Sequence, residues 1–404
     1  MKVLYFHQHF TTPMGRSGTR SYEMAKELVS RGHEVTIVCG SSGVGETGLD
    51  TAFYRGRREG VVEGIGVIEF ELPYSNADGF LKRAWTFLKF SFRSIKVVFS
   101  KRVDIVFATS TPLTAAIPGI VASWFTSAKF IFEVRDLWPE LPRAMGVIKN
   151  PIILFMMGVL ERRGYKAARH CIALAPGIRK GINRHVSEEK ITLIPNGCDV
   201  EFFSNNNDWR PDSIPPSHFL AIFAGAHGQA NGLDAVLDGA KELLKRGRLD
   251  IKILLIGDGR LKPALLQRQK DENIDNVVFH DPVRKERIAD LLSSADVGLQ
   301  ILANIPAFYY GTSPNKFFDY IAAGLPVLTN YPGWVADLIT ENNCGLATTP
   351  DDPGSFAESL ICLADDADQR REMGRAARVL AEREFDRKLL ASEFSTIFES
   401  LAGE

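Results

Sequence analysis

The stretch SPNKFFDYIAAGLPVLT, residues 313–329, predicts a short helix followed by a buried strand. Ser313 suits the N-cap position, Pro314 suits the first helical position, and Gly324 suits the position just beyond the last turn. Phe317 belongs to an apolar face that repeats every three to four residues. The LPVLT run that follows is typical of a short strand in an α/β core.

The polar face of this helix is a candidate nucleotide site. Asn315, Lys316 and Asp319 are spaced i, i+1 and i+4, so they share one side. The first turn offers free backbone N–H groups and a partial positive charge, and Lys316 adds a cation, which together favour a phosphate. Asp319, one turn deeper, can accept hydrogen bonds from a vicinal diol such as a ribose. The alternative is an ordinary helix–turn–strand unit without a ligand.

Length and composition limit the possible classes of protein. A chain of 404 residues is too long for one ordinary core, so two domains are expected. Lys plus Arg number 48 and Asp plus Glu 49, a balance that does not favour a nucleic-acid partner. The five cysteines form no CxxC pair, which suits a reducing cytosol. No signal peptide is expected, and the longest apolar run, residues 151–160, is too short to span a bilayer.

The N-terminal half opens with a strand, a glycine-bearing loop, a helix and a second strand. The loop, residues 11–19, follows the carboxyl end of the first strand, where open α/β sheets bind ligands. Gly15 and Gly18 permit close approach of backbone N–H groups to an anion, although the spacing is not GxGxxG. His9 lies near the same strand end, where it either contacts a sugar or acceptor or only closes the loop.

Two further strands of this half, residues 103–108 and 129–134, end in polar residues. Because these ends face the ligand edge of a parallel sheet, Arg135, Asp136 and Trp138 are site candidates. The alternative is a salt bridge that closes a loop.

After a linker rich in Asn, Pro and Ser, residues 205–217, the same pattern begins again. A strand at 219–223, a glycine-bearing loop at 225–232 and a helix at 233–246 precede a strand at 251–256 that ends in Gly-Asp-Gly. The chain therefore predicts two α/β halves, and a cleft between them is the default site.

Several motifs together resemble the retaining GT-B glycosyltransferases of family 4. They are IPNG at 194–197, GDG at 257–259, ADVGL at 295–299 and the stretch at 313–329. EVRDLWPE, residues 133–140, resembles the branch that builds bacterial O-antigen, capsule and exopolysaccharide, such as the N-acetylfucosaminyl transferases.

The resemblance implies a fold and a domain organisation. It implies an α/β fold of two Rossmann-like domains whose parallel sheets face each other across a cleft. Residues 1–204 would form the acceptor domain, 205–217 the linker and 218–383 the nucleotide-sugar domain. The final helix, 384–404, would cross back to the first domain.

The resemblance and the residues above together assign a site with no metal and no cofactor. Arg135, Asp136 and Lys316 are expected to be catalytic, and His9, Arg135 and Trp138 to bind the acceptor. The expected donor-binding residues are Gly15, Gly18, Gly225, Gly228, Asn231, Gly259, Ser313, Pro314, Asn315, Lys316 and Asp319.

The chain departs from the family pattern at five positions, one of which is the usual histidine of the acceptor domain, which would fall near Arg135. The usual pair of glutamates would fall on Gly311 and Asp319, so one carboxylate is absent and the other is a methylene shorter. The usual Arg and Lys of the diphosphate clamp would fall on Ala226 and Asn231. Backbone N–H groups of the 225–232 loop, with Lys316, are expected to replace that clamp.

The implied reaction is a front-face displacement with retention, in which the departing diphosphate takes the proton of the incoming hydroxyl. The sugar would move from a nucleotide-sugar, UDP-linked, to a polyprenyl-diphosphate-linked saccharide in bacterial surface polysaccharide synthesis. Two alternatives stay open: a nucleotide-sugar 2-epimerase of the same fold, and a catalytically degenerate nucleotide-binding partner subunit.

Residues 80–102 contain no acidic residue and predict an amphipathic helix. The stripe formed by Leu81, Leu88, Ile95 and equivalent positions is expected to face the core. The aromatic rings on the other side, beside Lys82, Lys89, Arg93 and Lys96, suit an anionic membrane surface. The expected location is therefore the cytoplasm, in peripheral contact with the inner face of the plasma membrane. The alternative is a helix buried between other elements.

Overall fold

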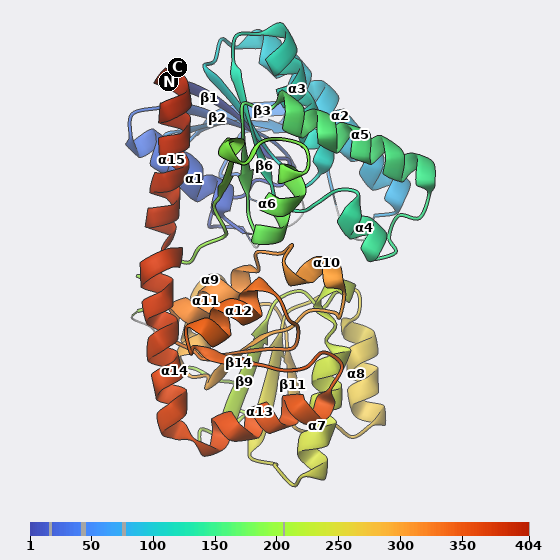
Figure 1. Cartoon of the computed structure of the whole chain (residues 1–404), viewed down its shortest axis with the longest axis vertical. Helices are drawn as coiled ribbons and strands as arrows, with labels where there is room; N and C mark the ends of the chain where they lie inside the picture. Colours follow the sequence, from blue (N-terminus) through green and yellow to red (C-terminus); the bar gives the residue numbers. More distant parts are fainter. Residues whose placement is uncertain (16–17, 42–45, 75–77, 205–206, 404) are drawn as a thin grey trace. The chain divides into compact units, whose positions relative to one another are not determined.

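The computed structural model shows two compact units and describes residues 1–15, 18–41, 46–74, 78–204 and 207–403 (Figure 1). Unit 1 comprises Met1–Pro195, Gly311–Ser313 and Lys388–Glu404. Unit 2 comprises Asn196–Tyr310 and Pro314–Arg387. Residues 205 and 206 of the expected linker lie outside the described residues, and the described part of that segment packs on unit 2, where the Trp209 N–H donates to the carbonyl of Asp290.

Unit 1 is built on an eight-stranded sheet with the order β3-β4-β2-β1-β5-β6-β7-β8. Its strands are β1 (Lys2–Phe6), β2 (Glu34–Gly40), β3 (Arg57–Val62), β4 (Ile65–Phe70), β5 (Ile105–Thr109), β6 (Lys129–Val134), β7 (His170–Ala173) and β8 (Ile191–Leu193). Its main helices are α1 (Arg20–Ser30), α2 (Phe80–Ser100), α3 (Ala116–Phe125), α4 (Glu140–Ala144), α5 (Pro151–Ala167), α6 (Pro176–Asn183) and α15 (Arg387–Gly403). All neighbouring strands run parallel except β3, which pairs antiparallel with β4.

The β3–β4 hairpin of unit 1 was not predicted by the sequence analysis. Its two-residue turn is Glu63 and Gly64, both with positive φ (48° and 83°). That geometry is typical of the tight turns that join antiparallel strands. The hairpin adds an edge to a sheet that is otherwise parallel.

Side chains alternate between the two faces of the unit 1 sheet, and both faces are covered. Phe107 of β5 meets Phe394 and Phe398 of α15, with ring centroids 5.2 and 5.4 Å apart, and α1 covers the same face. On the other side α3 packs against β5 and β6, and α2 and α5 flank α3 (Figure 1). Gly119 allows this approach, because a Cβ there would lie 2.0 Å from the Phe130 ring. Burial of both faces explains the continuous apolar runs of these strands.

Helix α2 presents the opposite face from the one predicted. The stripe expected in the core is mostly exposed: Leu81 is 81% exposed, and Trp85 and Phe92, which belong to the same stripe, are 57% and 61% exposed, whereas Leu88 and Ile95 are half-buried. The buried side is made of Phe90, which is 0% exposed, with Thr86, Ser91, Ser94, Val97 and Val98. The small hydroxyl residues allow a close approach; Ser91 Oγ donates to the carbonyl of Thr114, before α3. The prediction was wrong because periodicity identifies an apolar stripe but not its neighbour.

Unit 2 is built on a six-stranded parallel sheet with the order β11-β10-β9-β12-β13-β14. Its strands are β9 (Phe219–Ala224), β10 (Ile251–Ile256), β11 (Val277–His280), β12 (Val297–Gln300), β13 (Val327–Thr329) and β14 (Gly345–Ala347). Its helices are α7 (Asp234–Lys245), α8 (Lys262–Asp271), α9 (Lys285–Ser293), α10 (Pro306–Tyr309), α11 (Asn315–Ala322), α12 (Trp334–Glu341), α13 (Pro353–Asp365) and α14 (Ala367–Leu380). A π-helical turn, Ala381–Phe385, follows α14. The two α/β sheets confirm the predicted fold class.

The stretch at 313–329 forms the predicted helix, α11, and the predicted strand, β13. The helix begins one residue later than predicted: Pro314 is the N-cap, and no side chain caps the first turn. The predicted stop is present. Gly324 has φ +70°, its N–H donates to the carbonyl of Ile321, and the Leu325 N–H donates to that of Tyr320. This pair of bonds is a Schellman motif, which requires a left-handed residue after the helix.

Candidate functional site

Two loops of unit 2 pack directly on one another at the carboxyl ends of β9 and β10. The Gly225 N–H donates to the carbonyl of Ile256, and the His227 N–H donates to that of Asp258. A Cβ at Gly257 would lie 1.9 Å from the Gly225 oxygen, and one at Gly259 would lie 2.6 Å from the His227 oxygen. Only glycine permits this contact of main chain on main chain.

Helix α11 brings a cation to the first of these loops. The Lys316 ammonium donates to Asn231 Oδ1 at 3.2 Å and lies 4.8 Å from the centre of the Phe223 ring. Asn231 is itself held, since its Nδ2 donates to the carbonyl of Ala226 at 2.7 Å. Burial lowers the pKa of Lys316 to about 8, and the charge of Asp319 opposes that shift. Helix α11 thus supplies a cation to a loop that has no Arg or Lys of its own.

Asp319 lies one turn after Lys316 and is half-buried. Within the described residues its carboxylate makes no hydrogen bond and no close ion pair. Burial raises the pKa of Asp319, and the charges of Lys285 and Arg387 partly oppose the shift. A half-buried carboxylate with open acceptor positions can accept hydrogen bonds from hydroxyl groups of a ligand.

The other expected donor residues divide between the units. Asn315 is exposed on α11, and a Cβ at Gly228 would meet nothing within 4 Å. Gly15, Gly18 and Ser313 belong to unit 1. A Cβ at Gly15 would lie 2.0 Å from Thr11 Oγ1, so loop packing alone accounts for that glycine.

In unit 1, Arg135 joins a buried polar network at the carboxyl end of β6. Its Nε donates to Thr109 Oγ1 at 2.8 Å and to Glu133 Oε1 at 3.3 Å, and one terminal nitrogen donates to Ser21 Oγ. Glu133 is fully buried and also pairs with Arg20 at 2.9 Å. Arg135 therefore forms the salt bridge given above as the alternative, while its Nη1 makes no hydrogen bond within the described residues.

Burial shifts the pKa values of Asp136 and of the nearby histidines. Burial raises the pKa of Asp136, while a hydrogen bond from Thr111 Oγ1 at 2.9 Å opposes the shift. Burial, together with the charge of Arg135, lowers the pKa of His9 to about 4 and also lowers that of His7 well below its ordinary value. His9 also contacts the Tyr74 ring at 4.6 Å. His7 and His9 are thus neutral imidazoles beside Arg135.

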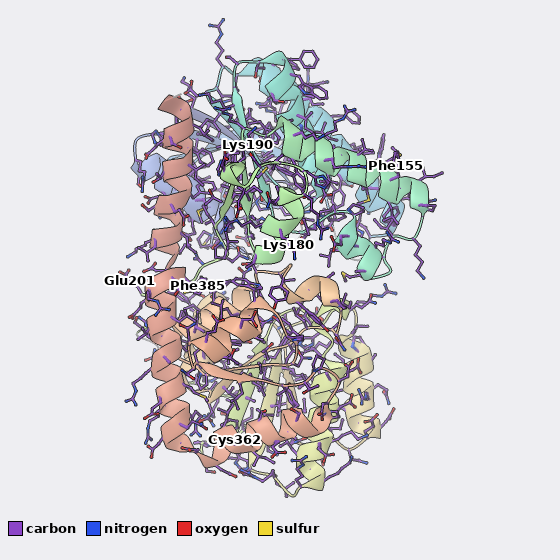
Figure 2. All side chains as sticks on the ribbon, viewed as in Figure 1. Phe155, Lys180, Lys190, Glu201, Cys362 and Phe385 are labelled. Atoms are coloured by element: carbon purple, nitrogen blue, oxygen red, sulfur yellow. The ribbon has the colours of Figure 1, made fainter. Side chains whose placement is uncertain are left out.

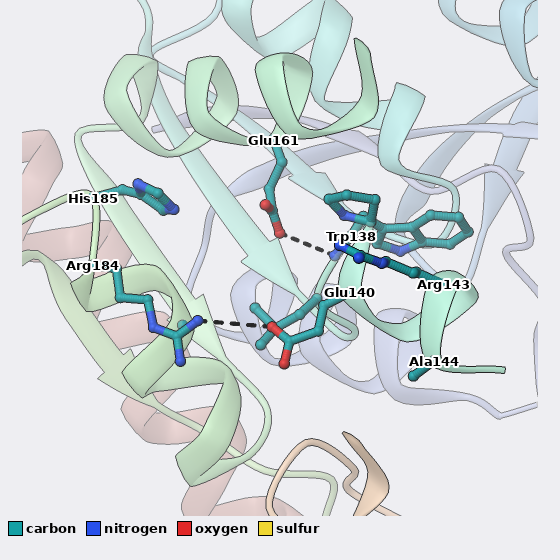
Figure 3. A pocket seen from close by; sticks show the side chains of 10 residues that line it. Trp138, Glu140, Arg143, Ala144, Glu161, Arg184 and His185 are labelled. Carbon is teal, nitrogen blue, oxygen red and sulfur yellow. Dashed lines mark hydrogen bonds and ion pairs between the residues drawn. The ribbon is translucent and has the colours of Figure 1, made fainter. Parts of the chain in front are cut away.

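Trp138, the third acceptor candidate, lines a pocket of about 570 Å³ within unit 1 (Figure 3). The pocket is formed by the segment after β6, by α5 and by α6. The charge of Arg135 thus acts on His9, whereas neither residue lines the pocket of Trp138.

Four functional candidates were missed by the sequence analysis. Glu133 was hidden in the apolar run of β6, and Arg20 at the start of α1 gave no signal of its partner 113 residues away. His227 is fully buried with both ring nitrogens unpaired among the described residues. Lys262 Nζ donates to the Gly257 carbonyl at 2.9 Å and so supports the GDG loop. Of these four residues, only Glu133 could have been identified from the sequence, because it is a charged residue inside a buried strand.

Two protein-family models match the chain. A glycosyl transferase 4-like domain matches residues 17–197, and a glycosyl transferases group 1 domain matches residues 218–366. A D-inositol 3-phosphate glycosyltransferase of Paenarthrobacter aurescens (strain TC1) is 25% identical over 236 residues, which cover 55% of this chain and 55% of that protein. The chain thus spans about half the length of this curated relative.

Two further similarities cover more of the chain. A probable glycosyltransferase of Pseudomonas aeruginosa, WbjE, is 23% identical over 350 residues, which cover 83% of this chain and 84% of that protein. The crystal structure of Alr3699/HepE of Anabaena in complex with UDP-glucose has a TM-score of 0.68 at 16% identity, covering 99% of this chain and 100% of that one. It therefore shares the fold. The chain belongs to the GT-B glycosyltransferases, with a glycosyl transferase 4-like domain followed by a group 1 domain.

Proposed function

We propose that the protein transfers a sugar from a UDP-linked donor, bound by unit 2, to an acceptor bound by unit 1. One observation carries the donor assignment: the Lys316 ammonium lies on the glycine loop that lacks the usual Arg and Lys, with Asp319 one turn deeper. The loop N–H groups and Lys316 would hold the diphosphate, and Asp319 the ribose diol. The solved structure of similar fold with UDP-glucose supports a UDP-sugar as donor.

The proposed reaction retains the configuration of the sugar and needs no metal. The departing diphosphate takes the proton of the incoming hydroxyl, so position and charge stabilisation suffice. Lys316 would neutralise part of the developing charge. On unit 1, the open Nη1 of Arg135 would bind a phosphate of the acceptor, with Asp136 beside it orienting the hydroxyl.

The proposed acceptor is a polyprenyl-diphosphate-linked saccharide of bacterial surface polysaccharide synthesis, held at an anionic membrane face. None of the described helices is long and apolar enough to cross a membrane. Helix α2 instead exposes Leu81, Trp85 and Phe92 along one side, and Lys82, Lys89 and Lys96 lie on the same side at seven-residue spacing. Rings interleaved with lysines suit peripheral binding to anionic lipid.

The two alternatives differ in their support. A 2-epimerase is not favoured, because both matching family models are glycosyltransferase models. The alternative of a degenerate nucleotide-binding subunit is motivated by the missing carboxylate at Gly311 and the missing cations at Ala226 and Asn231. Lys316 of α11 brings one cation to the loop, which weakens the case for a degenerate subunit.

Isothermal titration with UDP tests the donor site directly. Removing Lys316 deletes a charged hydrogen-bond donor, so Lys316→Ala should weaken UDP binding by about ten- to a hundredfold. Lys270→Ala, which removes an exposed lysine of α8, is the matched control and should change nothing. Equal UDP affinity of wild type and Lys316→Ala would overturn the assignment.

A further inference from the structure

The pocket that contains Trp138 carries polar groups that the donor site does not use. Glu161 of α5 is 8% exposed, and it accepts from the Trp138 backbone N–H at 3.0 Å (Figure 3). It also accepts from the Tyr165 hydroxyl at 2.7 Å. The indole N–H of Trp138 is buried and has no partner among the described residues. Burial raises the pKa of Glu161, and these two hydrogen bonds oppose the shift.

The charged side chains around the pocket include both signs. Arg143 and Arg184 face Glu140 and Glu161, and the closest pair, Arg184 and Glu140, is loose at 3.9 Å (Figure 3). His185 adds a neutral imidazole, because burial and then neighbouring cations lower its pKa. A site with two arginines and two carboxylates does not favour a simple anion.

Such a lining matches the chemistry of a saccharide. Sugar hydroxyls both donate and accept, so they can pair with guanidinium groups and with carboxylates at once. Leu137, Trp138 and Pro139 supply apolar surface for the C–H face of a sugar ring. Small apolar ligands would leave these polar groups without partners.

The position of the pocket connects it to the acceptor residues and to the apolar surface. Leu137 and Trp138 directly follow Arg135 and Asp136 in the chain. Helix α5, which provides Glu161, exposes Ile152, Phe155 and Met156 in its first two turns (Figure 2). A lipid-linked molecule at those turns would therefore have its saccharide near the pocket.

We infer that the Trp138 pocket binds the saccharide portion of the acceptor, an inference that rests on the proposed transferase function. None of the residues that line the pocket belongs to the network of Arg135, Ser21, Thr109 and Glu133, so a sugar in it would not take the place of an acceptor phosphate at Arg135.

The test follows the indole N–H signals of ¹⁵N-labelled full-length protein. Trp138→Phe identifies the Trp138 signal by its loss. The probes are glucose, galactose, N-acetylglucosamine, N-acetylgalactosamine, lactose and N,N′-diacetylchitobiose, with inorganic phosphate added separately. At least one saccharide should shift the Trp138 signal and leave that of Trp334, in unit 2, unchanged. Phosphate should shift neither.

Two variants and a control sharpen the result. Loss of one hydrogen-bonding partner should weaken saccharide binding about three- to tenfold in Arg143→Ala and in Glu161→Gln. Arg163→Ala removes an exposed arginine of α5 that does not line the pocket, and should bind as wild type does. If no saccharide shifts Trp138, or phosphate alone does, or both pocket variants bind as tightly as wild type, the inference is wrong. UDP titration of the same samples separates this failure from failure of the donor site.

Discussion

At the scale of single residues, donor binding is expected to depend most on Asp319. Its carboxylate lies half-buried beside the Lys316 face of α11 and makes no hydrogen bond within the described residues. Loss of a charged hydrogen bond costs on the order of 1.5–3 kcal/mol. Asp319→Ala should therefore weaken UDP binding by about ten- to a hundredfold in calorimetry. UDP affinity equal to that of wild type would remove Asp319 from the site.

Lys316 predicts a pH dependence of donor binding. Because burial lowers its pKa to about 8, the ammonium is present at pH 7 and is lost as the pH rises through 8. A diphosphate binds the protonated form, so UDP affinity should fall by up to about tenfold per pH unit above that value. Titrations at pH 7, 8 and 9 measure the slope. Lys316→Arg keeps its charge over this range, and its curve should be flat.

His227 predicts an acid-side loss of stability. It is fully buried between Phe223 and Phe279, and burial lowers its pKa to about 4. In the unfolded chain His227 takes up a proton near pH 6.5. Burial of the neutral imidazole therefore leaves the free energy of unfolding undiminished above that pH and reduces it below. The loss should be about 1.4 kcal/mol per pH unit between 6.5 and 4.

Thermal unfolding between pH 7 and 5 measures this loss. His227→Leu, which has no proton to gain, should reduce the pH dependence of the melting temperature. An unchanged slope in that variant would show that other groups cause the acid sensitivity.

At the scale of helices and strands, the exposed side of α2 predicts membrane binding. Each lysine near an anionic surface contributes about 1 kcal/mol. The variant Lys82→Glu/Lys89→Glu/Lys96→Glu should therefore no longer sediment with liposomes that contain phosphatidylserine. Arg93, included in the basic side by the sequence analysis, is instead held inward, where it donates to the carbonyl of Gly56 at 3.1 Å. It is left unchanged.

A matched control keeps the net charge of that variant. Lys245, Lys252 and Lys270 belong to unit 2 and not to α2, and their replacement by Glu should leave sedimentation unaffected. Wild type that never sediments, or a triple α2 variant that still does, would make α2 a purely structural helix.

The same elements show what a sequence can predict. The strands of β6 and β10 and the Gly324 stop of α11 were predicted correctly, because apolar runs and left-handed glycine positions are local properties. The face of α2 and the network of Arg135 were not, because both depend on partners distant in the chain: Thr114 for Ser91, and Thr109 and Ser21 for Arg135.

At the scale of the whole molecule, the order of strand, glycine loop and helix occurs twice and predicts two α/β sheets, which the structure has. In the part of the chain that the structure describes, no group of three His, Cys, Asp or Glu residues is arranged to hold a metal ion. In the proposed donor site, Lys316 and the loop N–H groups hold the diphosphate. Addition of a chelator should therefore leave UDP binding unchanged, and a requirement for magnesium would contradict the proposed site.

The most direct test of the central claim is transfer of radiolabel from UDP-sugars into a bacterial lipid extract in the presence of EDTA. We expect label from one UDP-sugar in the lipid fraction, release of UDP, and loss of transfer in Lys316→Ala. Free epimerised sugar nucleotide would indicate an epimerase. UDP binding without any labelled lipid, across UDP-glucose, UDP-galactose and their N-acetylated forms, would contradict the claim that this chain is itself a transferase.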